Sequence, residues 1–89
     1  NANHKKFSVY LRLDVKDKHG ILSDITKVMA KNKVSVKRLI QNPTANKQNA
    51  SIIIITHAAK SSSLLKILNQ LKNKNYIVNT PKIIRIEKI

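Results

Sequence analysis

Hydrophobic and polar residues alternate without a break near the start of the chain. The apolar positions are Phe7, Val9, Leu11, Leu13 and Val15. Because neighbouring side chains of a strand point to opposite faces, this alternation predicts a strand over residues 7–15 with one buried face. After Gly20 the apolar residues recur at every third or fourth position instead. That spacing predicts an amphipathic helix that ends near Asn32.

The rest of the chain divides into further strands and one more helix. The expected elements are a strand over 34–41, a loop over 44–49, a strand over 50–56, a helix with its apolar stripe over 64–71, and a strand over 83–89. The isoleucine run from Ile52 to Ile55 is too short and too β-branched for a helix, so it predicts a central strand covered on both faces. The serines Ser61, Ser62 and Ser63 are expected to cap the second helix.

The predicted order of elements is β-α-β-β-α-β. This order is typical of the ferredoxin-like α+β fold, an antiparallel sheet with two helices on one face. The other face of the sheet would carry Tyr10, Arg12 and two residues of the isoleucine run. Since so small a domain rarely leaves a half-apolar face in water, we expect a homo-oligomer that pairs through sheet faces or edge strands.

Length and composition narrow the class of protein. The 89 residues suffice for one small domain, which we expect over 7–89 after a disordered lead-in at 1–6. The first two residues have the character of a cloning remnant. Without cysteine, the chain can form neither disulfides nor a cysteine zinc site, so we expect a reducing, cytoplasmic setting. No apolar run approaches the roughly 20 residues of a membrane span, so we expect no membrane partner.

The formal net charge of +14 raises the affinity for nucleic acid whatever the fold. The basic residues, however, are spread over every segment of the chain. The aromatic residues are Phe7, Tyr10 and Tyr76, too few and too scattered for the stacking platforms of single-strand binders. A genome rich in lysine and asparagine codons explains the charge more simply. Nucleic acid is therefore not the expected partner, and a basic RNA-binding module of this fold is the alternative.

The turn from Asp17 to Leu22, between the first strand and the first helix, is the best candidate for a site. The backbone amides of Gly20, Ile21 and Leu22 would have no acceptor within the helix, and the helix dipole adds positive potential there. These amides can bind a small carboxylate, and the Asp17 carboxylate can bind an ammonium group. Glycine at position 20 leaves the approach open because it has no Cβ. In a simpler interpretation, Asp17 caps the helix and Gly20 serves only the turn.

Other chemistry finds less support in the sequence. The histidines His4, His19 and His57 lack the paired spacing of a metal site. No base is placed by spacing beside the serines at 61–63 to activate a nucleophile. With a single glycine, the chain cannot form a glycine-rich phosphate loop. We therefore expect no metal, no cofactor and no catalytic residue in this chain.

A family resemblance covers nearly the whole chain from Phe7 onward. The segment Leu13-Asp14-Val15-Lys16-Asp17-Lys18-His19-Gly20-Ile21-Leu22 resembles the opening of an ACT domain, a module that binds free amino acids and regulates metabolic enzymes. Within that family, five further segments resemble the C-terminal regulatory domain of homoserine dehydrogenases. They are Tyr10–Leu13, Val34–Val36, Ile40–Pro43, Ile55–His57 and Ile84–Glu87. ACT domains of acetolactate synthase small subunits and of guanosine tetraphosphate synthetases share the first motif but fit the later segments less well.

The resemblance implies a regulatory domain whose oxidoreductase, with its NAD(P) site, precedes it in a longer protein. It implies a free amino acid as the ligand, with threonine as the expected effector. The positions it marks for the ligand are Asp17, His19, Gly20, Ile21, Leu22, Ser35 and Gln41. The last two follow the first helix and form a second wall that often comes from a neighbouring subunit. ACT domains usually have proline where this chain has His19, and without that ring the turn is less rigid before a ligand binds.

Overall fold

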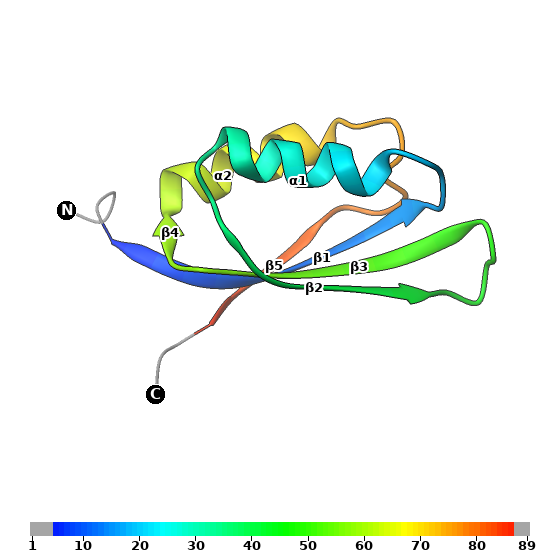
Figure 1. Ribbon diagram of the computed structural model, residues 1–89, viewed down its shortest axis with the longest axis horizontal. Coiled ribbons are helices and arrows are strands. Elements are labelled where there is room, and N and C mark those ends of the chain that lie inside the picture. The colour runs from blue at the N-terminus through cyan, green and yellow to red at the C-terminus, as the bar shows by residue number, and fades with distance from the viewer. Residues whose placement is uncertain (1–4, 87–89) are drawn as a thin grey trace.

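The secondary structure follows the predicted βαββαβ order. The computed structural model describes residues 5–86 (Figure 1). Its elements are β1 (Lys6–Lys16), α1 (Ile21–Lys31), β2 (Val36–Pro43), β3 (Asn49–Thr56), β4 (Ala59–Lys60), α2 (Ser61–Lys72) and β5 (Lys82–Ile86). The two-residue strand β4 comes in addition to the predicted elements. The last strand was expected to reach Ile89, but residues 87–89 lie outside the described part of the chain, as does His4.

The strand pairs of the sheet are antiparallel. The strands lie in the order β2-β3-β1, and the other edge of β1 is shared by β4 and β5. β4 pairs with residues 6–7 of β1, and β5 pairs with residues 8–12. Farther along the same edge, Ile77 forms an isolated bridge with Val15. This bridge brings the segment after α2 beside the end of β1, where the predicted site begins.

Both helices lie on one face of the sheet, as predicted (Figure 1). The β1 residues Leu11 and Leu13 point toward them and are 2% and 0% exposed. They belong to one core with Ile25 and Met29 of α1 and Leu71 of α2. Burying a side chain of this size contributes about 1.5–3 kcal/mol, which holds the helices, and with them the start of α1, in place on the sheet. Neither described helix has the length and hydropathy needed to cross a membrane.

Within residues 5–86, no helix or strand covers the opposite face of the sheet, which we call the open face. Ile52 and Ile54 of β3 are buried beneath the helices, whereas Ile53 and Ile55 on the other side are half-buried. The predicted division of this run between the two faces is therefore confirmed. The expectation that β3 is covered on both faces was wrong, because α1 and α2 pack side by side on the same face (Figure 1).

The second strand begins at Val36, two residues later than predicted. α1 ends in a turn in which the amide of Val34 donates to the carbonyl oxygen of Met29 at 3.0 Å. Lys33 in this turn has a left-handed φ of 61°. Val34 is thus buried as part of the helix end rather than as part of a strand. Ser35 consequently lies just before β2.

The start of α2 also differs from the prediction. The helix begins at Ser61, and Lys60 before it is extended, with φ −67° and ψ 142° and no side-chain cap. The serines at 61–63 therefore occupy the first helical turn, and the prediction that they cap the helix was wrong. The reason is strand β4, which pairs Lys60 with Lys6 of β1 and leads directly into the helix.

Candidate functional site

The turn between β1 and α1 is held by backbone hydrogen bonds on both sides. The amide of Asp17 donates to the carbonyl oxygen of Gln48 at 2.7 Å. At the other end, the first helical bond runs from the amide of Asp24 to the carbonyl oxygen of Gly20 at 3.0 Å. The amides at 20–23 precede this bond, so they have no acceptor within the helix. The positive end of the helix dipole lies at the same place.

The backbone conformation at Gly20 is one that favours glycine. Its φ of 84° is left-handed, and a Cβ built there would meet no other atom within 4 Å. Strain in the backbone, and not crowding, therefore disfavours most other residues, and the space in front of the turn is open. Gly20 itself occupies the capping position of α1, which has no side-chain cap. The simpler interpretation in which Asp17 caps the helix was therefore wrong.

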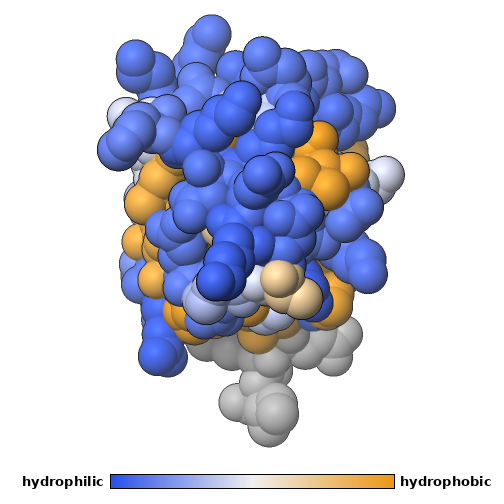
Figure 2. All heavy atoms as spheres, turned by 90° about the vertical axis from the view of Figure 1, so that its right-hand side faces the viewer, coloured by the Kyte–Doolittle hydropathy of each residue, from blue (hydrophilic) through white to orange (hydrophobic). Residues whose placement is uncertain are grey.

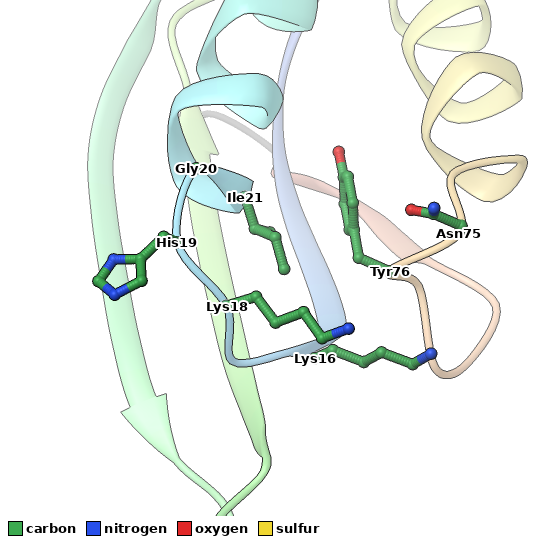
Figure 3. A pocket seen from close by; sticks show the side chains of 7 residues that line it. All are labelled: Lys16, Lys18, His19, Gly20, Ile21, Asn75 and Tyr76. Carbon is green, nitrogen blue, oxygen red and sulfur yellow. The ribbon is translucent and has the colours of Figure 1, made fainter.

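A hollow of about 350 Å³ opens beside this turn. Its lining residues are Lys16, Lys18, His19, Gly20, Ile21, Asn75 and Tyr76 (Figure 3). Ile21 and Tyr76 supply its apolar surfaces, and the side chains of the two lysines extend along its outer side. The imidazole of His19 points away from Tyr76. Figure 2 shows that this end of the molecule is mostly hydrophilic, so the hollow offers an anion positive charge in a polar setting.

Tyr76 joins the far wall of this hollow to α1. Its hydroxyl donates a hydrogen bond of 2.6 Å to Oδ2 of Asp24, in the first turn of α1. The Lys74 ammonium nitrogen lies 3.3 Å from the same oxygen. The bond from Tyr76, with a smaller effect of Lys74, lowers the pKa of Asp24 below its usual value of 3.8. Burial, and then the Asp24 carboxylate, raise the pKa of Tyr76. At neutral pH the hydroxyl is therefore protonated and Asp24 is ionised.

Part of the predicted site lines this hollow, namely His19, Gly20 and Ile21. The next predicted residue, Leu22, lies at the surface of α1 and is 37% exposed. The structure therefore brings together the centre of the predicted turn, and it adds Tyr76 as a neighbour from a distant part of the chain.

The other predicted residues lie elsewhere in the same protomer. Asp17 and Gln41 line a second hollow of about 350 Å³, against the hairpin between β2 and β3. Ser35 lines a third hollow beside Thr26 and Met29 of α1. Within one copy of the chain, the predicted second wall is thus separated from the Gly20 turn.

The sequence analysis missed the wall made by Asn75 and Tyr76. In the sequence both belong to a stretch rich in lysine and asparagine that has no periodicity. Their position depends on the bridge between Ile77 and Val15, which pairs residues far apart in the chain. A single aromatic residue at the end of a polar stretch was the available signal, and it does not reveal which part of the molecule that residue contacts.

Comparison with known sequences assigns the family. The family model of the ACT domain matches residues 9–75. A homoserine dehydrogenase of Helicobacter pylori is 35% identical over 78 residues, which cover 88% of this chain and 18% of the relative. A homoserine dehydrogenase of Bacillus subtilis is 30% identical over 79 residues, with coverage of 88% and 18%. The chain thus spans less than a fifth of the length of these relatives.

Solved structures share the fold. A homoserine dehydrogenase from Thiobacillus denitrificans superposes with a TM-score of 0.84 at 23% identity, over 97% of this chain and 19% of that one. The regulatory subunit of aspartate kinase from Thermus thermophilus gives a TM-score of 0.62 at 13% identity, over 91% and 52%. At these identities the structural likeness concerns the fold alone. From the family match and the sequence relatives, the chain belongs to the ACT domain family and is related to a part of homoserine dehydrogenases.

Proposed function

We propose that this domain binds a free amino acid and thereby regulates a homoserine dehydrogenase of which it forms a part, with threonine as the effector. The related sequences support the choice of enzyme. The observation that carries the proposal is the left-handed Gly20, which places the first amides of α1 at the edge of a hollow lined by Lys16 and Lys18.

The ligand carboxylate would accept hydrogen bonds from the amides of Gly20 and Ile21. The helix dipole favours an anion there, and the ammonium groups of Lys16 and Lys18 add positive charge at the mouth of the hollow. Hydrogen bonds to charged groups contribute about 1.5–3 kcal/mol each. Two of them together contribute about 3–6 kcal/mol, a range that includes the roughly 4 kcal/mol of a millimolar dissociation constant.

Of the other predicted ligand residues, Asp17 belongs to the turn itself, whereas Ser35 and Gln41 lie away from Gly20 in one protomer. Asp17 would bind the ligand ammonium from the hairpin side of the turn. Ser35 and Gln41 line hollows away from Gly20 within one protomer. We therefore infer that a second copy supplies them as the second wall, so that assembly completes the effector site.

The open face of the sheet offers a surface for this second copy. Tyr10 of β1 pairs with Ile55 of β3 on one side and with Ile84 of β5 on the other. Directly opposed residues share a face, so these three apolar side chains lie in a row across the sheet. Ile84 is 60% exposed, and covering it would contribute about 25 cal/mol for each Å² removed from water. We propose a homo-oligomer that forms through this face or through the outer edge of β2, which pairs with no other described strand.

The oxidoreductase activity would lie outside this chain. The chain corresponds to 18% of the Helicobacter pylori relative, so the NAD(P) site and the catalytic residues would belong to the remaining length. We place this enzyme in the cytoplasm, where its ACT domain would read the concentration of the amino acid.

Calorimetric titration of L-threonine into the wild-type chain tests the proposal. The informative pair of variants is Gly20→Asp and Gly20→Asn, whose side chains have the same shape and both tolerate a left-handed backbone. Only aspartate adds a negative charge beside the ligand carboxylate. We expect the wild-type chain to bind and the Asp variant to bind at least about tenfold more weakly than the Asn variant, as the loss of one charged hydrogen bond would cause.

D-Threonine serves as the stereochemical control, and circular dichroism shows whether each variant is folded. Equal affinity of the two folded variants would place the ligand away from Gly20. If neither threonine nor any other common amino acid binds the wild-type chain at about 10 mM, the domain is not a sensor. Sedimentation of the same samples reports whether the bound state is an oligomer.

A further inference from the structure

The segment between α2 and β5 forms the wall of the hollow opposite Gly20, and two kinds of contact hold it. Its backbone pairs with β1, where the amide of Lys16 donates to the carbonyl oxygen of Tyr76 at 2.9 Å. Its side chains reach α1 instead, through Tyr76 and Lys74, which both contact Oδ2 of Asp24 at 2.6 Å and 3.3 Å. The backbone hydrogen bond to β1 already fixes the position of this segment. The side-chain contacts with Asp24 can therefore serve a purpose other than holding the segment in place.

The Tyr76 hydroxyl is not needed to bury the residue. The ring belongs to the main core and the residue is 9% exposed. Its packing would therefore persist without the hydroxyl, which would leave no buried polar group unpaired. What the hydroxyl does is to bind one particular carboxylate, that of Asp24.

Asp24 is the acidic residue in the first turn of α1, close to the amides at Gly20. A carboxylate in this turn stabilises the helix through the dipole. The same charge repels any anion that binds to the amides at the helix start. An ionised aspartate here therefore favours the helix and disfavours the ligand proposed for it.

In the structure, the Asp24 carboxylate can stabilise the helix without facing the proposed ligand. Asp24 is not among the residues that line the hollow, although Ile21 in the same helical turn is. The Asp24 side chain is 38% exposed, so packing alone does not determine its rotamer. Its bonds to Tyr76 and Lys74 determine it, and Lys74 also offsets its charge.

We propose that Tyr76 is a positioning residue for the effector site: its hydroxyl holds the Asp24 carboxylate away from the amides that bind the ligand carboxylate at Gly20. This inference rests on the proposed function, because it assumes an anionic group at Gly20. It assigns to the far wall of the hollow a part in setting ligand affinity, although Tyr76 acts through Asp24 and not on the ligand.

The composition of the chain allows a direct test. Gly20 is the single glycine, so protein labelled with ¹⁵N-glycine gives one backbone amide signal, at the proposed site. Its shift is followed during titration with L-threonine and, separately, with inorganic phosphate at constant ionic strength. The variants are Tyr76→Phe, Asp24→Asn and the two combined. Ser62→Ala is the control, because it removes an exposed hydroxyl from the start of α2, outside the hollow.

Tyr76→Phe should weaken binding of both ligands about two- to fivefold, the effect of one charge near a helix end. Ser62→Ala should bind as the wild-type chain does. Adding Asp24→Asn to Tyr76→Phe should restore the affinity, because the carboxylate that the tyrosine restrained is no longer charged. If the Tyr76 hydroxyl only stabilised the fold, the combined variant would bind the ligands no more tightly than Tyr76→Phe does.

Unchanged affinity in Tyr76→Phe, or a combined variant that stays weak, would overturn the inference. If phosphate moves the Gly20 signal but threonine does not, threonine is the wrong effector, and the phosphate series still decides the role of Tyr76. If neither ligand moves the signal in the wild-type chain, both proposals fail. If Tyr76→Phe does not fold, Asp24→Asn remains as the test. It should bind phosphate at least as tightly as the wild-type chain does, and weaker binding would contradict the inference.

Discussion

The two helices of this domain begin in different ways. α1 starts after Gly20, which is left-handed with φ 84°, and has Asp24 in its first turn. α2 starts after Lys60, which is extended with φ −67°, and has no acidic residue in its first turn. Neither helix has a side-chain hydrogen bond at its capping position. Both starts therefore leave amides without a partner from a capping side chain.

What differs is the surroundings of these amides. The start of α2 continues directly from β4, whose Lys60 pairs with Lys6 of β1. The start of α1 instead faces a hollow with Tyr76 on its far wall. An uncapped helix start is thus common to both helices, and a candidate site arises only where a second segment provides a wall. The following predictions test this contrast.

The capping residues should differ most in their tolerance of a side chain. Gly20→Ala should lower the free energy of unfolding by about 1–2 kcal/mol, because alanine pays the left-handed penalty although no atom lies in its way. Lys60→Ala, at an ordinary φ, should change it by less than about 0.5 kcal/mol. Urea unfolding followed by circular dichroism measures both. An equal loss of stability in both variants would mean that the left-handed backbone before α1 does not make its capping position less tolerant of a side chain than that of α2.

Alkaline unfolding should reveal the link between Tyr76 and α1. Because the pKa of Tyr76 is raised in the folded state above the usual value of 10.0, the unfolded chain releases this proton first. The associated stability is present below pH 10 and is lost as the pH rises above it, at no more than about 1.4 kcal/mol per pH unit. Tyr76→Phe should lack this loss, while Tyr10→Phe should follow the wild-type chain. Urea unfolding between about pH 9 and 12 checks this, and parallel curves for all three proteins would contradict it.

The smallest effect concerns the missing acid in α2. Ser62→Asp supplies a carboxylate in the first turn, as Asp24 does in α1, and should raise the free energy of unfolding by about 0.3–1 kcal/mol at low salt. Ser62→Ala should be nearly neutral, since α2 has no side-chain cap for it to disturb. Thermal unfolding at low and high salt measures the difference. A gain that persists at high salt would speak against a dipole effect.

Local patterns were sufficient for most of the fold. The alternation around Leu11 and Leu13 predicted β1 and its buried face, and the change of spacing after Gly20 predicted α1. The patterns failed where tertiary contacts determine the local structure. Strand β4 leads directly into α2, so Ser61 begins the helix instead of capping it. Val34 bonds to the end of α1 and so lies outside the strand in which it was predicted. In the site, the glycine turn before α1 was predicted, whereas the left-handed φ of Gly20 and its neighbour Tyr76 were not.

The sequence by itself determined the order of the predicted elements, the buried face of β1 and the position of the glycine turn before α1, because these depend on the spacing of neighbouring residues along the chain. Only the tertiary structure decided what surrounds that glycine. Antiparallel pairing of Ile77 with Val15 brings Tyr76 to the Gly20 turn. The same packing separates that turn from Ser35 and Gln41 within one protomer, because distances across a sheet are set by which strands pair and not by spacing along the chain.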